Sequence, residues 1–394
     1  MIKTIDECFF QIQNGGNIKQ GDVEGGFPIT RIETTANDKF NRDRMGYAGI
    51  TDISKYEAYV LEDGDLLMSH INSVQYLGRT VLYVKQPNET IIHGMNLLRL
   101  KARRNIINPA YARYYFYGHQ FRYQIGNITK KSVNQASFAV KDLKQIEIEV
   151  PSLEEQDMVV AILDKLQKLI DMRKDELASL DNLIKARFVE MFGNPVTNEK
   201  GWKQKQLSEI TTKLGSGSTP KGGKEAYQEE GITLIRSMNV HNGLFQYKEL
   251  AHISKEQAAK LDNVTIEEND VLLNITGASV ARSCVVPSKI LPARVNQHVC
   301  IIRCNQCIAP EFLNKLLIDD NYQRLLWSIA GAGATREAIT KQQVESLHII
   351  MPPIEMQNQF ADFVKQVDKS KVAVQKALDE TQMLFDSLMQ KYFM

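Results

Sequence analysis

No segment of the sequence is long and apolar enough to cross a membrane. The 394 residues contain no run of 18 or more apolar residues, which is about the shortest helix that spans a bilayer. The opening segment MIKTIDECFFQIQNGG carries acidic residues early and has no long apolar core, so no secretion signal is expected. Hydrophobic residues make up 43% and charged residues 24%, as in ordinary globular chains. We expect a soluble cytoplasmic protein with reduced cysteines and no membrane partner.

Familiar catalytic motifs are missing as well. The segment GSTPKGGKE, which ends at Glu225, approaches a phosphate-binding glycine-rich loop, but a second glycine intrudes and Glu225 stands where a hydroxyl residue is required. There is no Gly-x-Gly-x-x-Gly after a predicted strand, no His-Glu-x-x-His and no serine-nucleophile motif. The Asn-Pro-Pro-aromatic and Asp-Pro-Pro-Tyr signatures of amino-methyltransferases are absent too. We therefore expect no catalytic residues and no cofactor in this chain.

Three cysteines near the C-terminal third allow two interpretations. Cys300, Cys304 and Cys307 lie close to His298, and cysteine and histidine at such spacing can bind zinc. However, HVCIIRC (298–304) also has the pattern of a buried strand, in which cysteine acts as a small hydrophobic residue. We favour the strand, because the matching stretch of the first half of the chain has no cysteine, and we expect no metal.

One short phrase occurs twice in the chain. VPSLEEQ (150–156) returns 201 residues later as MPPIEMQ (351–357). In both copies a proline is followed by a hydrophobic residue, a glutamate and a glutamine. Proline and acidic residues favour the first turn of a helix, the latter because the helix dipole is positive there. The phrase therefore predicts two equivalent helix starts.

The charge follows the same period as the phrase. The long blocks 1–150 and 195–351 are mildly basic, with net charges of +3 (19 basic and 16 acidic residues) and +2 (18 and 16). The short blocks 151–194 and 352–394 are acidic, with −3 (6 and 9) and −1 (5 and 6). We interpret the long blocks as two domains and the short blocks as two helices.

Each short block carries a heptad pattern of apolar residues, typical of a helix that packs along one seam. Eight of ten seam positions are apolar in both blocks, and no glycine or proline interrupts either seam. The exceptions include Arg173, Arg187 and Lys371, which either snorkel or mark contacts with partner subunits. Each helix could pack only on its own domain, but we favour an antiparallel pair with a pseudo-two-fold axis. FGNP (192–195) predicts the end of the first helix.

The long blocks resemble each other along their length. EDGDLLMS (62–69) aligns with EENDVLLN (267–274), and NQASFAVKDLKQIEI (134–148) with TREAITKQQVESLHI (335–349). Short apolar patches predict strands, and two matching segments after Pro109 and Pro310 predict helices. The predicted fold class is α+β: two mixed α/β domains joined by two long antiparallel coiled-coil helices, with an internal pseudo-two-fold repeat.

Several features favour contact with nucleic acid. No acidic residue occurs between Glu89 and Asp142, a span that holds many basic and aromatic residues. We expect the aromatic residues there to be core packing, whereas the polar loops around 130–135, 215–223 and 331–338 could reach phosphates or bases. Four arginines recur at aligned places, as shared DNA contacts or as shared structural ion pairs. The candidate DNA-binding residues are Arg31, Arg79, Lys130, Lys131, Ser132, Asn134, Gln135, Lys221, Lys224, Arg236, Arg282, Thr335 and Arg336.

Taken together, these motifs resemble the specificity (S) subunit of type I restriction-modification enzymes. The resemblance covers the full chain: two domains of about 150 residues, each followed by a helix that opens with Pro-x-Leu/Ile-Glu-x-Gln. GWKQKQLSEI (201–210), LGSGSTP (214–220) and NQHVCIIR (296–303) are similar to phrases of that family. The first domain departs from the pattern, because it lacks the Gly-Trp opening of the second.

The resemblance implies a function and a set of partners. Each domain would be a target-recognition domain that reads one half of a split double-stranded DNA sequence, and the helices would set the spacer. Two modification (M) subunits would bind the helices and methylate adenine with S-adenosylmethionine, and restriction (R) subunits would use ATP and magnesium to translocate and cleave DNA. The S subunit itself would be non-catalytic. A DNA-binding or scaffold protein outside a restriction system, or a free-standing enzyme, are the alternatives.

Overall fold

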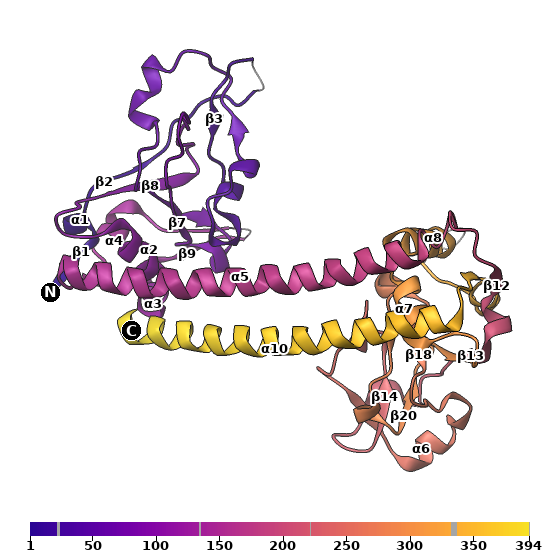
Figure 1. The fold of residues 1–394 in the computed structure, drawn as a ribbon. Coiled ribbons are helices and arrows are strands. Elements are labelled where there is room, and N and C mark those ends of the chain that lie inside the picture. Colours follow the sequence, from indigo (N-terminus) through magenta and orange to yellow (C-terminus); the bar gives the residue numbers. More distant parts are fainter. Residues whose placement is uncertain (22–23, 134, 221, 332–336, 394) are drawn as a thin grey trace. The chain divides into compact units, whose positions relative to one another are not determined.

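The chain divides into two compact units, each described here by itself. The computed structural model describes residues 1–21, 24–133, 135–220, 222–331 and 337–393. Unit 1 comprises Met1–Lys174 with Lys376–Met394, and unit 2 comprises Asp175–Gln375. Figure 1 shows the order of the elements along the chain. Within the described residues, no helix has the length and apolar character that a bilayer crossing requires.

Unit 1 contains short strands and short helices ahead of the first long helix. Its strands are β1 (Ile2–Thr4), β2 (Phe9–Asn14), β3 (Pro28–Ile29), β4 (Gly46–Tyr47), β5 (Leu66–Ser69), β6 (Ile71–Asn72), β7 (Thr80–Leu82), β8 (Leu97–Ala102), β9 (Lys130–Lys131), β10 (Ala136–Ser137) and β11 (Glu147–Glu149). Its short helices are α1 (Ile5–Cys8), α2 (Pro109–Tyr117), α3 (His119–Ile128) and α4 (Val140–Lys144).

Unit 2 repeats this composition. Its strands are β12 (Gln204–Gln206), β13 (Thr211–Ser216), β14 (Ile232–Ile235), β15 (Val240–His241), β16 (Leu244–Phe245), β17 (Ala251–Ile253), β18 (Val271–Asn274), β19 (Ser283–Val285), β20 (Ala293–Val295), β21 (Val299–Cys304) and β22 (His348–Ile350). Its short helices are α6 (Lys255–Ala259), α7 (Pro310–Leu317), α8 (Asp320–Gly331) and α9 (Lys341–Glu345).

The main sheets of the two units have the same topology. The strand order is β2-β8-β5-β7 in unit 1 and β13-β21-β18-β19 in unit 2, and all neighbours are antiparallel. A small sheet pairs the first strand of each domain with the last, β1 with β11 and β12 with β22. The first domain therefore begins like the second although it lacks the Gly-Trp phrase. The internal repeat predicted from the sequence is confirmed at the level of strand order.

Two long helices complete the chain, α5 (Leu153–Phe192) and α10 (Ile354–Phe393), each of 40 residues. At the start of α5, the Ser152 hydroxyl and backbone N–H both donate to the Glu155 carboxylate, and the Glu155 N–H donates back to the hydroxyl, which is a capping box. At its end, Gly193 adopts a left-handed conformation with φ +74°, as helix-terminating glycines do. Both predicted helix boundaries are confirmed.

The glutamine of the repeated phrase fastens each helix start to its domain. Gln156 and Gln357 are fully buried. The Gln156 amide donates to the carbonyls of Ile106 and Pro151, both at 3.0 Å, and accepts from the Asn108 N–H at 2.8 Å. Gln357 repeats this pattern in unit 2: it donates to the carbonyls of Cys307 and Pro352 and accepts from the Ala309 N–H at 2.9 Å. Each partner lies 201 residues after its counterpart. The phrase recurs because the same joint is built twice.

The two helices contact each other within both units, and α10 lies beside α5 in Figure 1. In unit 2, Lys371 pairs with Asp181 at 2.6 Å, and the Phe360 ring lies 5.6 Å from that of Phe188. Residue numbers rise along one helix as they fall along the other, so the pair is antiparallel, as predicted. In unit 1, the Arg173 guanidinium donates to the carbonyl of Ala377. Both cations that interrupt the seam, Arg173 and Lys371, therefore reach the opposite helix.

The domains also pack on both helices. The core of unit 1 includes Val159 and Leu163 of α5 together with Phe393 of α10. The core of unit 2 includes Phe188 of α5 and Phe360 of α10. The tyrosines of α2, Tyr111, Tyr114 and Tyr115, are buried in unit 1, which confirms that these aromatic residues are core packing. Packing of helix on helix and of helix on domain thus occur together, rather than as alternatives.

Candidate functional site

The four recurring arginines lie at equivalent points of the two units. Arg31 and Arg236 each precede a 3-10 helix, Ile32–Asp38 and Ser237–Asn239 respectively. Arg31 is exposed and its Nε donates to Gln20 Oε1 at 2.5 Å. The half-buried Arg236 donates to the Glu249 carbonyl. Both side chains therefore tie their own loops together.

The second arginine pair is also engaged within its domain. Arg79 forms an ion pair with Asp38 at 2.9 Å and lies over the Tyr76 ring, 4.5 Å from its centroid. Arg282 Nη1 lies 3.5 Å from His241 Nδ1. Of the two explanations for their recurrence, structural ion pairing therefore has direct support at Arg79. An arginine with part of its donors free can still meet a phosphate, because the guanidinium has five of them.

The basic loop of unit 1 forms a small exposed hairpin between β9 and β10. Lys130, Lys131, Ser132 and Gln135 are all exposed. The Ser132 N–H and hydroxyl both donate to the Gln135 carbonyl at 2.8 Å, which closes the turn. β10 pairs with β6 on its other side, so the hairpin is anchored to the domain. Lysines held at the tip of an anchored hairpin are well placed to meet a DNA backbone.

Four candidate residues lie outside the described part of the chain: Asn134, Lys221, Thr335 and Arg336. Of Lys224, only the backbone is described, in the 3-10 helix Gly223–Ala226. The place where the 331–338 loop rejoins unit 2 is described, since Thr276 forms an antiparallel bridge with Ala338 and the Gly277 N–H donates to the Glu337 carbonyl at 2.9 Å.

A polar cluster that the sequence did not single out lies at this junction. The Thr219 hydroxyl donates to the Gln297 amide oxygen, Gln297 Nε2 is 3.1 Å from His298 Nε2, and Thr276 Oγ1 is hydrogen-bonded to His298 Nδ1. The four side chains come from three separate segments. Thr219 belongs to one loop predicted to contact DNA, and Thr276 bridges to the other. Only the recurrence of small polar residues in these loops could have indicated the cluster.

The cysteines lie in or beside a strand, as favoured above. Cys300 is buried in β21, and burial raises the pKa of its thiol to about 12. Burial likewise raises the pKa of the Cys304 thiol to about 12. In the described ranges, no group of three His, Cys, Asp or Glu side chains is placed to hold a metal ion. The thiols of Cys300 and Cys304 are therefore poor metal ligands, since metal binding needs the thiolate.

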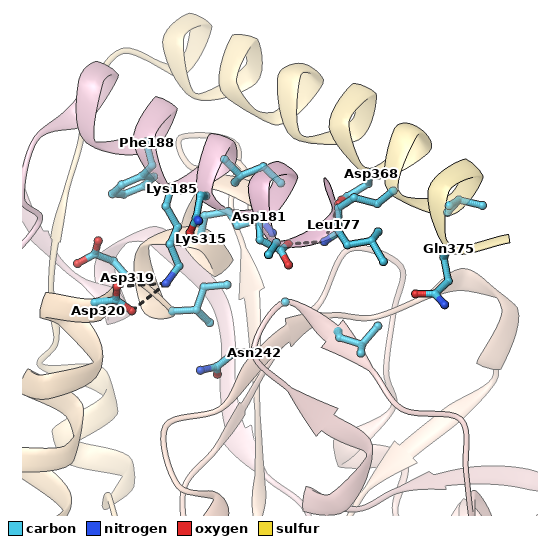
Figure 2. Close-up of a pocket in the computed structure, with 18 residues that line it drawn as sticks. Leu177, Asp181, Lys185, Phe188, Asn242, Lys315, Asp319, Asp320, Asp368 and Gln375 are labelled. Atoms are coloured by element: carbon cyan, nitrogen blue, oxygen red, sulfur yellow. Dashed lines mark hydrogen bonds and ion pairs between the residues drawn. The ribbon is translucent and has the colours of Figure 1, made fainter. Parts of the chain in front are cut away.

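A cavity of about 830 Å³ opens in unit 2 beside the helix pair. Figure 2 shows side chains from α5 and α10, such as Asp181 and Asp368, around it, together with Asn242 of the turn between β15 and β16. Its walls include Phe188 and two side chains with most of their surface exposed, Leu244 (61%) and Val372 (70%). Its rim carries ion pairs between Asp181 and Lys371 and between Lys185 and Asp320. Apolar walls with a charged rim suit an amphipathic protein segment.

Comparisons with known proteins agree with this architecture. The sequence matches the family described as "Type I restriction modification DNA specificity domain" twice, over residues 3–182 and 199–381. It is 27% identical to a Methanocaldococcus jannaschii protein described as the type I restriction enzyme MjaX specificity subunit, over 95% of this chain and 90% of the relative. The EcoKI specificity subunit of Escherichia coli is 21% identical, over 58% of this chain and 51% of the relative.

Two solved structures share the fold. The type I restriction-modification S subunit from M. genitalium has a TM-score of 0.61 at 14% identity, covering 100% of this chain and 96% of that one. A chain from a study of complex assembly and conformational transition of the type I R-M system has a TM-score of 0.57 at 16% identity, covering 100% and 97%.

Proposed function

Because this chain belongs to the family of type I restriction-modification DNA specificity subunits, we propose that its two domains read the two halves of a bipartite DNA sequence. The chain is a DNA sequence-specificity subunit without catalysis of its own. The observation that carries the proposal is the duplication: both family matches include one domain and a long helix, and both domains have the same strand order. Two readers on one chain suit a target of two separate parts.

The proposed domain limits follow the sequence blocks. Residues 1–150 and 195–351 are the two target-recognition domains, and residues 151–194 and 352–394 are the spacer helices. The described ends of α5 and α10 lie inside these limits. The helices set the distance between the readers, because a continuous helix is a stiff spacer of about 1.5 Å per residue.

The proposed DNA-contacting groups are the exposed hairpin of unit 1 and the corresponding loops of unit 2. The exposed lysines of the hairpin supply phosphate contacts, and arginines that already tie a loop can add one more donor each. The full set proposed is Arg31, Arg79, Lys130, Lys131, Ser132, Asn134, Gln135, Lys221, Lys224, Arg236, Arg282, Thr335 and Arg336.

The proposed partners are two modification subunits, bound through the helices, and restriction subunits. S-adenosylmethionine, ATP and magnesium are used by those partners, and none by this chain. The cavity beside the helix pair in unit 2 is a proposed docking place for a modification subunit. Its exposed Leu244 and Val372 would lose water on binding, and its rim charges would set the orientation of the partner.

The duplication is tested by exchanging one domain. Residues 1–150 are replaced by the corresponding domain of another specificity subunit, and the methylated sites of the host genome are sequenced. The expected result is a new first half-sequence beside an unchanged second one. A change in both halves would contradict the modular arrangement. Methylation by the purified chain alone with S-adenosylmethionine would identify a free-standing enzyme instead.

The docking place is tested by charge insertion. Leu244→Asp and Val372→Asp should reduce copurification with the modification subunit, because a buried unpaired carboxylate is costly. Val84→Asp is the matched control, since Val84 is 61% exposed but lies in unit 1 away from the long helices. Equal recovery of the complex with all three variants would exclude the cavity.

A further inference from the structure

The polar cluster of unit 2 has a topological counterpart in unit 1. Asn14 faces Leu98 across β2 and β8, and Ser216 faces Cys300 across β13 and β21, so positions here correspond at a spacing of 202. A glycine follows the first strand in both units. A side chain on Gly15 would meet the His93 carbonyl oxygen at 2.2 Å, and one on Gly217 would meet that of Val295 at 1.7 Å. Both loops therefore press against the turn that precedes the central strand.

This correspondence pairs side chains of different chemistry. Gln297 corresponds to Met95, His298 to Asn96 and Thr219 to Asn17. The next strands, β18 and β5, correspond at a spacing of 205, which pairs Thr276 with Ile71. Thr276 bridges to Ala338 as Ile71 pairs with Ser137, so this match is consistent across the neighbouring segment too.

The two versions of this surface differ in polarity. We name it the turn surface: Thr219, Thr276, Gln297 and His298 in unit 2, and Asn17, Ile71, Met95 and Asn96 in unit 1. In unit 1, Met95 is 48% and Ile71 40% exposed, and the nearby hairpin presents Val133 with its surface fully exposed. In unit 2, the corresponding places carry an amide, an imidazole and hydroxyls. Exposed apolar side chains on one copy and a hydrogen-bonded polar set on the other are not needed by a shared fold.

The recurring arginines contrast with the turn surface. They are the same in both units and are engaged by their own loops, as Arg79 is by Asp38. Positions that hold the common fold should recur, whereas positions that select a sequence should differ between two domains that read different half-sites. The turn surface meets the second criterion, and it adjoins both loops of unit 2 that the sequence predicted to contact DNA.

We infer that the turn surface selects bases in each half-site, through hydrogen bonds from Gln297 in unit 2 and through apolar contact from Met95 in unit 1. The inference rests on the proposed function and names its specificity-determining residues. Glutamine can hold adenine by a bidentate contact with N6 and N7, and apolar side chains recognise the methyl group of thymine. Unit 2 would therefore require an adenine at one position, and unit 1 a thymine.

The hydrogen bonds around Gln297 prepare it for this contact. Its amide nitrogen donates to His298 Nε2, so the imidazole carries its proton on Nδ1 and donates it to the Thr276 hydroxyl. Its amide oxygen accepts from Thr219. An amide has two donor hydrogens and two acceptor lone pairs, so one of each remains for a base. Fixing the amide in advance lowers the entropy cost of the contact.

The test uses the assembled modification complex in cells, with sequencing of all methylated sites. Gln297→Met places the unit 1 side chain in unit 2 and removes the hydrogen-bonding groups at similar size. The expected result is loss of discrimination by roughly 5- to 150-fold at one base pair of one half-site, with the other half-site unchanged. Met95→Gln should alter one position in the other half-site. Gln204→Met, on the exposed strand β12, is the matched control and should leave both halves intact.

The outcomes separate this inference from the proposed function. If the unaltered complex methylates no bipartite sequence, the proposed function fails before any variant is considered. If it does, and Gln297→Met leaves every position of the motif as strict as before, the inference is wrong. A uniform fall in methylation at an unchanged motif would also overturn it, because that pattern indicates a phosphate contact rather than a base contact.

Discussion

The buried glutamine joint gives a sharp test of how each helix is fixed to its domain. Gln357→Leu keeps most of the side-chain volume but removes both hydrogen-bonding groups. The Ala309 N–H and the Pro352 carbonyl, now bonded at 2.9 and 2.8 Å, would stay buried without partners. Each such group costs about 1–3 kcal/mol, so the total is about 2–6 kcal/mol. The 3.4 Å contact with the Cys307 carbonyl adds little.

The measurement can be confined to unit 2. Both tryptophans of the chain, Trp202 and Trp327, lie in that unit, so tryptophan fluorescence during heating reports its unfolding. For a unit of this size, 1 kcal/mol shifts Tm by about 2–4 °C, and a loss of about 3 kcal/mol should lower Tm by about 6–12 °C. The control is Gln366→Leu, at an exposed position of the same helix, with little expected change. Equal melting of the two variants would refute the joint as a source of stability.

Three further predictions concern the DNA surface, the spacer and the pH dependence. Changing both Lys130 and Lys131 to Ala should weaken DNA binding by the assembled complex and reduce the slope of log K against log salt by about 2, at about 0.9 for each phosphate contact; an unchanged slope in a salt titration would exclude the hairpin. Matched seven-residue insertions after Leu177 and Leu378 keep the heptad seam in phase and lengthen each helix by about 10 Å, so the spacer should grow by up to about three base pairs at about 3.4 Å each; methylome sequencing that finds the original gap in a folded complex would reject the helices as the ruler. Burial lowers the pKa of the His93 imidazole to about 3, whereas the unfolded chain protonates it below about pH 6.5, so stability is full above that pH and falls by about 1.4 kcal/mol per unit as the pH decreases toward 3; urea titrations should show a smaller fall for His93→Asn, and an identical fall would assign the effect to other groups.

Much of the fold was readable because it depends on periodicity and on repetition. The heptad seams, the proline and acidic residues at the helix starts and the glycine after Phe192 are local signals, and they predicted both long helices and their ends. The same offset near 201 in many short phrases predicted two like domains without any knowledge of their strand order. These signals are strong because each reflects a constraint on neighbouring residues, such as capping or side-chain direction, that operates along the chain itself.

The candidate site was predicted less completely, because a side chain's partners come from distant segments. The alignment of Arg79 with Arg282 was visible in the sequence, but it could not show that Arg79 is paired with Asp38. Nor could it show that Thr219, Thr276 and Gln297 meet, since they belong to three separate segments that only the sheet brings together. Exposed polar residues carry no periodic signal, so nothing local distinguishes a reading surface from an ordinary loop.

The sequence by itself determined the class of the protein: two basic domains, two seam-forming helices, an internal repeat and no catalytic motif. It even recorded the joint between them, since the glutamine of the repeated phrase has no other evident reason to recur. Only the tertiary structure decided what that glutamine bonds, which helix residues complete each domain core, and which polar side chains gather at the turn surface. The physical reason is that helix formation and its limits follow from short-range contacts, whereas hydrogen-bond partners such as Gln357 and Ala309 are set by the folding of the whole unit.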